Sequence, residues 1–368
     1  MTKVIHVVHH SLSFALPKER LEIGIFESWA ARVGKRVLKE TNEFDIECFT
    51  PEKSFKNMEI KEGSGITFKI FPSFALRSGY EISLPLLREI KRVSKQEKVI
   101  LHLHGLHYPF VSLISKIFSS LPVVIQHHGE SPFPRIKTFF EPFTLKKVRK
   151  VLAVSKAEIE YISRILPKER VLLQGMGVDF NFCQPTERKH ARKILNLPQD
   201  KKLLLYVGAP YKIKWREMLD AVKVLKEKFD VDMLLIDRGE NEMFSEVKRM
   251  GGIALAPVPR EQMPLYYSAV DAYILNATDM IAKWGGIGIA PVEAAACGTP
   301  MVSTNLIHFP NDEWTGIGTI PNGNLVDAIK EVLDAPERFR NCRELAMKHY
   351  EWENITKNTI GIYRDIIS

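Results

Sequence analysis

The chain has 368 residues, more than a single hydrophobic core usually holds, so we expect two domains of about 150 to 200 residues each. Its apolar content of 45% and charged content of 26% are ordinary for a folded soluble protein and exclude a largely disordered or fibrous chain. A net charge of +8 favours anionic partners, such as nucleotide sugars, lipid headgroups or nucleic acid, without choosing among them.

Short apolar runs alternate with helical patterns along the first half of the chain. Helices are expected over Ile25–Leu38, Leu84–Ser94 and Lys156–Ile165. This alternation implies right-handed crossovers and a mainly parallel sheet that is covered on both faces. The strands expected here are Val4–Val8, Ile46–Phe49, Ile66–Ile70, Val99–His104, Pro122–Gln126, Val151–Val154 and Val171–Leu173.

The second half repeats this scheme, with helices expected over Trp215–Lys228, Glu261–Ser268 and Leu325–Leu333. The polar, proline-containing stretch Phe182–Lys189 is typical of a linker, so we place the join between the domains there. The strands expected here are Leu203–Val207, Met233–Ile236, Ile253–Ala256, Ala272–Leu275, Met301–Thr304 and Ile317–Ile320.

Cysteine usage and apolar runs bear on the cell compartment. The four cysteines are widely spaced, which indicates neither a zinc site nor a disulfide framework. The amino terminus alternates like a strand and lacks the long apolar core of a signal peptide. Tyr108–Leu121 is the best candidate for a membrane span, but it is too short and carries Lys116. We therefore expect a cytoplasmic protein that does not span a bilayer.

The stretch Lys283–Ser303 places a glycine cluster and one carboxylate around a short apolar helix. Gly285, Gly286 and Gly288 can bring the backbone close to a ligand, and the helix start would point free N–H groups at an anion. Glu293, one turn inside, would face the same cleft and accept a pair of sugar or ribose hydroxyls rather than a phosphate. The combination predicts a nucleotide that carries both phosphates and a sugar.

Seven short blocks follow one another along nearly the whole chain. Their order resembles that of the family 4 retaining glycosyltransferases, also called glycosyltransferase group 1. The resemblance implies the GT-B fold, an α/β fold of two facing Rossmann-like domains with mainly parallel sheets and an interdomain cleft. It also implies an acceptor-side domain over residues 1–183, a nucleotide-sugar-binding domain over 184–350, and a terminal helix over 351–368 that returns to the first domain. The blocks are His102–Gly105, Pro122–Gly129, Val151–Lys156, Gly177–Asp179, Tyr206–Gly208 with Lys214, Val258–Asp271 and Pro291–Pro300, and Tyr350–Trp352 resembles the start of the terminal helix.

Carried over residue by residue, the resemblance implies a donor site on the second domain. Lys214 matches the lysine that neutralises the donor diphosphate, and Glu293 matches the second glutamate of the E-x7-E motif, which holds the ribose. His128 matches a first-domain histidine that contacts the transferred sugar near its reactive centre. These three are the expected catalytic residues. The expected donor-binding residues are Gly24, Gly208, Lys214, Val258, Lys283, Gly285, Gly286, Gly288 and Glu293.

Three positions depart from the family pattern. The first glutamate of E-x7-E falls at Gly285, the arginine that normally follows Gly208 is Ala209, and the amino-terminal loop keeps one glycine, Gly24, where the family usually has two. These changes permit an unusual donor sugar, or a domain that binds without turnover. The cations that could restore positive charge are Lys212, Arg216 and Lys283.

Each candidate residue also has a purely structural interpretation. Glu293 could be a solvated first-turn glutamate that favours the helix dipole, and Lys214 an ordinary surface lysine. His128 could be a structural histidine at a strand end. No histidines combine with carboxylates in a recognisable metal spacing, so we expect no metal, and no cofactor besides the nucleotide-sugar co-substrate.

The segment Pro134–Lys150 is basic and aromatic, with Glu141 as its single acid. Such a surface resembles an interfacial membrane contact, where each cation contributes about 1 kcal/mol near anionic lipid. The alternative is a helix whose phenylalanines pack inward and whose cations are solvated. Nucleic-acid binding is not favoured, because no recognised module accompanies the charge. The residues concerned are Arg135, Lys137, Phe139, Phe140, Phe143, Lys146, Lys147, Arg149 and Lys150.

The sequence therefore predicts a retaining, metal-independent glycosyltransferase of the hexosyltransferase type. It would move a sugar from a nucleotide-diphosphate donor to a glycan, lipid-linked or small-molecule acceptor, in the cytoplasm or peripherally at the inner membrane face. The alternative is a non-catalytic nucleotide- or glycan-binding subunit with the same fold. An oxidoreductase is disfavoured, because no G-x-G-x-x-G follows the first strand.

Overall fold

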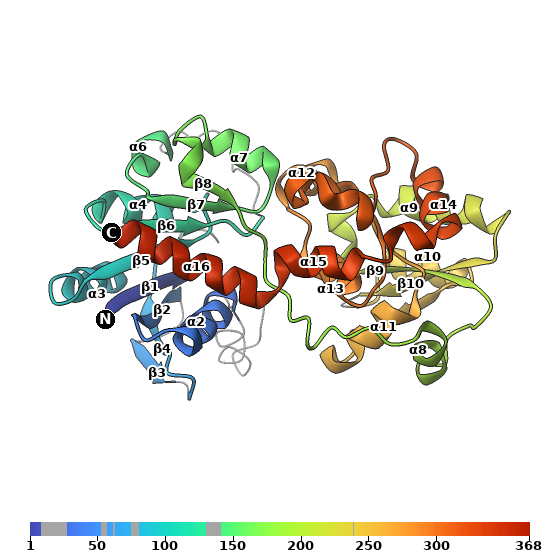
Figure 1. The fold of residues 1–368 in the computed structure, drawn as a ribbon, viewed down its shortest axis with the longest axis horizontal. Helices are drawn as coiled ribbons and strands as arrows, with labels where there is room; N and C mark the ends of the chain where they lie inside the picture. Colours follow the sequence, from blue (N-terminus) through green and yellow to red (C-terminus); the bar gives the residue numbers. More distant parts are fainter. Residues whose placement is uncertain (9–27, 53–56, 62, 75–80, 130–140, 238) are drawn as a thin grey trace. The chain divides into compact units, whose positions relative to one another are not determined.

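The computed structural model describes residues 1–8, 28–52, 57–61, 63–74, 81–129, 141–237 and 239–368. The chain divides into two compact units (Figure 1): unit 1 comprises Met1–Gln174 and Ile355–Ser368, and unit 2 comprises Gly175–Asn354. Each unit is built on its own mainly parallel sheet with helices between successive strands. The expectation of two Rossmann-like α/β domains is confirmed.

The described part of unit 1 contains an eight-stranded sheet with the order β3-β4-β2-β1-β5-β6-β7-β8. The β3–β4 pair is antiparallel, and the other pairs are parallel. The central strands β1, β5 and β6 are almost completely buried, which explains their continuous apolar runs. The strands are β1 Thr2–Val8, β2 Phe44–Glu52, β3 Met58–Lys61, β4 Thr67–Pro72, β5 Val99–His104, β6 Val123–Gln126, β7 Lys150–Ala153 and β8 Val171–Leu173.

Serine caps begin three helices of unit 1. The hydroxyls of Ser28, Ser83 and Ser155 accept backbone N–H groups in the first turns of α2, α3 and α7. The stretch weighed as a membrane span contains the short helix α4, and among the described residues no helix is both long and apolar enough to cross a bilayer. In the described residues before the chain enters unit 2, the α-helices are α2 Trp29–Glu40, α3 Leu84–Ser94, α4 Pro109–Ile117, α6 Glu141–Leu145 and α7 Lys156–Ile162.

The last helix, α16 (Trp352–Ile367), completes unit 1. Its Tyr363 is fully buried, with the ring centroid 5.4 Å from that of Phe44. Ile362 packs with Val124 and Leu152 of the sheet. Full burial of a side chain of this size contributes about 1.5 to 3 kcal/mol, which helps to hold the helix on the sheet.

Unit 2 contains a six-stranded, fully parallel sheet in the order β11-β10-β9-β12-β13-β14. The strands are β9 Lys202–Val207, β10 Val231–Ile236, β11 Ile253–Leu255, β12 Ala272–Leu275, β13 Met301–Ser303 and β14 Gly318–Thr319. The helices are α8 Arg188–Ile194, α9 Trp215–Lys226, α10 Glu242–Arg249, α11 Met263–Ala269, α12 Asp279–Trp284, α13 Ile289–Ala296, α14 Leu325–Asp334 and α15 Cys342–Tyr350.

Candidate functional site

The strand order of unit 2 reverses between β9 and β12. From β9 the chain adds β10 and β11 on one side, and then β12, β13 and β14 on the other. Ligands of open parallel sheets bind at such a switch point, beyond the carboxyl ends of the two strands. The loops that leave these strands are tied together, because Lys214 N–H donates to Asn276 O over 2.8 Å and Thr278 N–H donates to Lys212 O over 3.0 Å. The structure therefore places the loop from Gly208 to Lys214 at the switch point.

Gly208 and Ala209 give this loop its shape. Gly208 has φ 137°, a region that other residues rarely adopt, and a Cβ there would lie 3.1 Å from the Tyr206 hydroxyl oxygen. That hydroxyl donates to the carbonyl of Ala209 over 2.9 Å. The backbone conformation at position 208 therefore requires glycine. Ala209, where the family has arginine, contributes no charge.

Lys214 directly precedes α9 and has an acidic partner. Its ammonium lies 2.6 Å from a carboxylate oxygen of Asp279, in the first turn of α12. The hydrogen bond to Asp279 raises the pKa of Lys214, which keeps it cationic. Asp279 is 91% exposed, so this ion pair is easily exchanged for a phosphate. A pocket of ≈ 330 Å³ adjoins the lysine, lined by Pro210, Tyr211, Ile213, Lys214, Trp215, Arg216 and Glu217.

The glycine loop lies between α12 and α13. Gly286 has φ 61° and Gly288 has φ 86°, so both need the left-handed backbone freedom of glycine. Gly285 has an ordinary φ of −79°, but a Cβ there would lie 2.7 Å from the carbonyl oxygen of Ile281. The side chain of Asn305 donates to the carbonyls of Ile281 and Gly286 and fixes the loop. Glycine at 285 therefore has a packing reason of its own.

Glu293 is buried inside α13, with 9% of its side chain exposed. The Tyr267 hydroxyl donates to one carboxylate oxygen over 3.0 Å, and Arg260 donates to the other over 3.3 Å. Each oxygen has a second lone pair, so the carboxylate can still accept two ligand hydroxyls. The interpretation of Glu293 as a solvated surface glutamate is wrong, because the side chain is buried and held by two donors.

Arg260 and Tyr267 are the residues that sequence reasoning missed. Both lie in the block Val258–Asp271, but their spacing gives no sign that α11 and α13 approach each other. Val258 itself is partly buried against the core of unit 2, two residues before Arg260. Arg260 also stacks on Phe182, 5.1 Å from the ring centroid, so its guanidinium is held from two sides.

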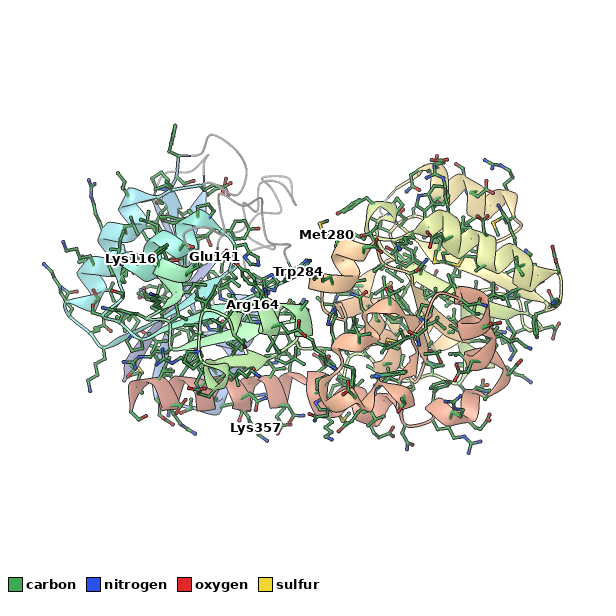
Figure 2. The ribbon with its side chains drawn as sticks, turned by 90° about the horizontal axis from the view of Figure 1, so that it is seen from above. Lys116, Glu141, Arg164, Met280, Trp284 and Lys357 are labelled. Atoms are coloured by element: carbon green, nitrogen blue, oxygen red, sulfur yellow. The ribbon has the colours of Figure 1, made fainter. Side chains whose placement is uncertain are left out.

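Helix α12 connects Lys214 to the glycine loop. Figure 2 shows Met280 and Trp284 along this helix, whose first residue Asp279 pairs with Lys214 and whose end leads into Gly285. Lys283 is exposed, with its ammonium 5.2 Å from the Trp284 ring centroid. Of the other cations weighed, Arg216 lines the pocket beside Lys214 but bonds Glu242 over 2.7 Å. Gly24, the remaining donor residue expected, lies outside the described residues.

In unit 1 the corresponding switch point lies between β1 and β5, and histidines gather beside it. His128, half-buried beyond β6, bonds His104 over 2.9 Å, and His104 bonds His6 over 2.9 Å. Tyr363 bonds His6 over 3.2 Å and His102 over 2.7 Å. Burial lowers the pKa of His6 to about 3 and holds that of His102 well below its usual range. The four imidazoles and the phenol form one continuous chain.

Two further imidazoles pair with buried glutamates. His107 Nδ1 lies 2.8 Å from Glu141, which also accepts the Tyr161 hydroxyl, and His127 Nδ1 bonds Glu158. Burial raises the pKa of Glu158. Within the part of the chain that the structure describes, two sets bring ligand-type atoms within 4.8 Å of one another, namely His6, His102 and His104, and His107, His127 and Glu158. The first consists of stacked rings, in which both nitrogens of His6 and of His104 and Nδ1 of His102 already bond within the chain described above. Absence of a metal stays a prediction.

The described part of the basic aromatic segment has two faces. Glu141, labelled in Figure 2, is buried together with Leu145 and Val148, whereas Phe143 is 60% exposed. Lys150 bonds Asp365 and the carbonyl of Glu169. The cations on the exposed face are Lys146, Lys147 and Arg149. Arg135, Lys137, Phe139 and Phe140 lie outside the described residues.

Comparison with known families assigns most of the chain. Residues 187–349 match the family described as glycosyl transferases group 1, and residues 35–182 match glycosyltransferase family 4. Among curated proteins, the chain is 24% identical over 262 residues to D-inositol 3-phosphate glycosyltransferase 2 of Catenulispora acidiphila. That match covers 64% of this chain and 60% of the relative. The D-inositol 3-phosphate glycosyltransferase of Mycobacterium tuberculosis is 25% identical over 265 residues, which cover 65% of this chain and 53% of the relative. The matched region thus spans less than two thirds of these relatives.

Solved structures share the fold over the full length. The Anabaena protein HepE, in complex with UDP, has a TM-score of 0.70 at 13% identity, covering 99% of this chain and 100% of HepE. A sucrose-phosphate synthase from Thermosynechococcus elongatus has a TM-score of 0.69 at 16% identity, covering 100% of this chain and 99% of the synthase. At these identities the likeness establishes the two-domain GT-B class of fold.

Proposed function

Because the chain belongs to the family of group 1 glycosyltransferases, we propose that it transfers a sugar from a nucleotide-diphosphate sugar to an acceptor hydroxyl, with retention of the anomeric configuration. One observation carries the proposal: the switch point of the unit 2 sheet holds Lys214 beside a pocket and, one short helix away, the glycine loop. A lysine point charge and a glycine-rich backbone are the groups that receive a diphosphate.

Lys214 and the start of α13 would stabilise the leaving diphosphate. Charge grows on the bridging oxygen as the bond to the sugar breaks, and preorganised positive groups lower the free energy of that transition state. The exposed Asp279 carboxylate would release Lys214 to the incoming phosphate. The first turn of α13 offers the backbone N–H groups of Ile289 and Ala290, since Pro291 has none. With this charge supplied by the protein, the proposed reaction is metal-independent.

Glu293 would bind the ribose. Tyr267 and Arg260 hold its two oxygens in place, so the carboxylate is oriented before the ligand arrives. Vicinal ribose hydroxyls would each donate to one oxygen. His128 of unit 1 would contact the transferred sugar, and Gly24 and Val258 would complete the donor contacts, as the family resemblance implies.

UDP-sugars are the first donors to test, because HepE has been crystallised with UDP-glucose. The acceptor would be a glycan, a lipid-linked sugar or a small polyol, the last suggested by the inositol phosphate in the names of the curated relatives. We further propose a cytoplasmic site of action, peripheral at the inner membrane face. The exposed Phe143 with the neighbouring cations Lys146, Lys147 and Arg149 supports this location.

A thermal-shift screen of UDP, ADP and GDP and of their glucose conjugates tests donor binding. A saturating ligand at about 100 times its Kd stabilises the protein by about 2.7 kcal/mol. The donor found in this way is then incubated with excess chelator, and the anomeric proton of the product is followed by NMR. Transfer or slow hydrolysis with retained configuration supports the proposal. Inversion, or complete loss of activity that metal restores, contradicts it.

A non-catalytic nucleotide- or glycan-binding subunit is the second candidate. The observation that favours it is Gly285, which replaces the first motif glutamate at a point where Ile281 leaves no room for a Cβ. Nucleotide sugars that bind but are consumed with none of the acceptor classes would support this function instead.

A further inference from the structure

Three consecutive loops of unit 1 bring polar side chains together at one edge of its sheet. His107 follows β5, His127 follows β6, and Glu158 lies in the first turn of α7, which follows β7. These strands are parallel neighbours in the order β5-β6-β7, so their carboxyl ends meet at the same edge. One ligand-type atom of each residue lies within 4.8 Å of the others. The fold therefore builds a convergent set of two imidazoles and one carboxylate.

This set is enclosed, and two of its polar atoms are unused. The side chains of His107, His127 and Glu158 are 0% exposed. His107 Nε2 and Glu158 Oε1 are buried, and neither atom has a hydrogen-bond partner among the described residues. Buried polar atoms without partners are few in folded proteins, and each calls for an explanation. Two of them in one enclosed set indicate a ligand that binds to both.

The other ring nitrogen of His107 is already held. Its Nδ1 lies 2.8 Å from Oε1 of Glu141, whose other oxygen accepts the Tyr161 hydroxyl over 2.5 Å. The carboxylate accepts the N–H of Nδ1, so the neutral ring has its lone pair on Nε2. Histidines that bind metal ions almost always donate their other N–H to a carboxylate, a backbone carbonyl or water, which orients the ring. His107 thus has the surroundings of a metal ligand.

The charge in this neighbourhood also favours a cation. Glu141 and Glu158 are both buried, and within the described part of the chain neither carboxylate contacts a lysine or an arginine. Buried charges in proteins are paired or coordinate metal ions. Two imidazolium ions could supply the pairing, but a charged His107 would carry a buried N–H at Nε2 with no acceptor in the residues that the structure describes. One divalent cation balances both carboxylates and gives both unused atoms a partner.

We propose that His107, His127 and Glu158 bind one divalent metal ion of the zinc type, and that Glu141 orients His107 for this purpose. Zinc binds imidazole nitrogen and carboxylate oxygen, whereas Mg²⁺ and Ca²⁺ prefer oxygen ligands. Ligands at about 2.0 to 2.2 Å from a zinc ion lie at most about 4.4 Å apart, so small side-chain rotations bring the set around the ion. His127 Nδ1 already contacts Glu158, so the ion would replace a contact within the set.

The metal site is separate from the proposed reaction and does not rest on it. It belongs to unit 1, whereas the charge on the leaving diphosphate is assigned to Lys214 and α13 of unit 2. Because the ligands are buried, chelator added to the folded protein should leave the ion in place, so the chelator test of the reaction keeps its meaning. A bound ion would show the sequence-based expectation of a chain without metal to be wrong, because spacing along the chain cannot reveal a set drawn from three loops.

The metal content of the protein tests the site directly. The full chain is produced without an affinity tag in minimal medium that contains Zn²⁺ or Co²⁺, and it is purified in chelator to remove ions from the surface. Elemental mass spectrometry should find one ion per chain, and the Co²⁺ protein should show the visible absorption of cobalt with histidine ligands. A parent protein that carries neither ion overturns the proposal.

Matched variants locate the ion. His107→Gln and Glu158→Gln should lose it, whereas His190→Gln on the surface of α8 and Glu160→Gln on the surface of α7 should keep it. Glu141→Gln keeps all three ligands and removes the charge beside His107, so affinity for the ion should fall roughly ten- to hundredfold. An ion that both His107→Gln and Glu158→Gln retain in full would overturn the assignment of its ligands.

The parent protein alone also decides the question if a ligand variant does not fold. X-ray absorption spectra at the zinc edge identify the ligand atoms, and the expected set is imidazole nitrogen with carboxylate oxygen. Thiolate sulfur around the ion would assign it to cysteines and contradict the site. None of these measurements needs a sugar donor, so a failure of the proposed function leaves their result unchanged.

Discussion

Replacing Glu293 by glutamine tests the donor site with minimal change of shape. The carboxylate lies between the Tyr267 hydroxyl and Arg260, with 9% of its side chain exposed. Glutamine keeps an oxygen for one partner and turns the other acceptor into an N–H donor, so one ribose hydroxyl meets a donor instead of an anion. A hydrogen bond to a charged group contributes about 1.5 to 3 kcal/mol, so nucleotide affinity should fall roughly ten- to hundredfold.

The protein without ligand should change much less. Arg260 is 51% exposed, and breaking an ion pair of this kind costs at most about 1 kcal/mol. Titration calorimetry with UDP measures the affinity, and thermal unfolding monitors the fold. Glu313→Gln is a matched control, because Glu313 is also held by two groups of unit 2, Lys348 and His349, but on the surface. Unchanged nucleotide affinity in a folded Glu293→Gln protein would refute the donor-site assignment.

Three further changes address separate parts of the structure. Lys214→Met should lower turnover by about a hundredfold or more, because it removes the charge that stabilises the leaving group. Lys223→Met, on the surface of α9, should leave turnover unchanged, and equal activity of the two variants would remove Lys214 from the mechanism. Gly285→Ala should destabilise unit 2 by about 1 to 3 kcal/mol in thermal unfolding, because the new Cβ meets the Ile281 carbonyl. Gly239→Ala should leave the stability unchanged, because a Cβ there would meet nothing within 4 Å. An unchanged stability of Gly285→Ala would show that packing does not require this glycine. Cosedimentation with vesicles should require anionic lipid, weaken with salt and drop when Lys146, Lys147 and Arg149 are replaced by glutamine. The control variant replaces the exposed Lys91, Lys95 and Lys98 by glutamine. Equal vesicle binding by the two variants would leave the α6 surface without a membrane role.

The core strands were predictable from the sequence because they are buried on both faces. The expected bounds of Val99–His104 and Ala272–Leu275 agree with β5 and β12 to the residue. The bounds of the partly buried edge strand β8, Val171–Leu173, also agree, because its three residues are all apolar. The edge strand β3 was not predicted, since only alternate residues of its four are even half-buried and its apolar pattern is weak. Short helices such as α8 and α10 were not predicted for a similar reason, because a polar helix of one or two turns shows little hydrophobic periodicity.

The donor loop was recognisable in the sequence, but the groups around it were not. Gly286 and Gly288 have the positive φ that their clustering indicated, whereas Gly285 is glycine because of Ile281, a contact that only the turn of α12 creates. The histidine chain shows the same limit. The sequence contains His102 and His104 on one face of a strand, but the neighbour relation with His6 requires the β1–β5 register.

The connection of α16 to unit 1 has a consequence for the order in which the protein can form during synthesis. Unit 1 consists of two parts of the chain, and the whole of unit 2, Gly175–Asn354, is translated between them. Unit 2 can complete its core while unit 1 still exposes the surface around Val124 and Leu152 that Ile362 later covers. Over this interval residues 1–174 form an incomplete domain, and the apolar surface that it exposes favours aggregation until α16 has been synthesised.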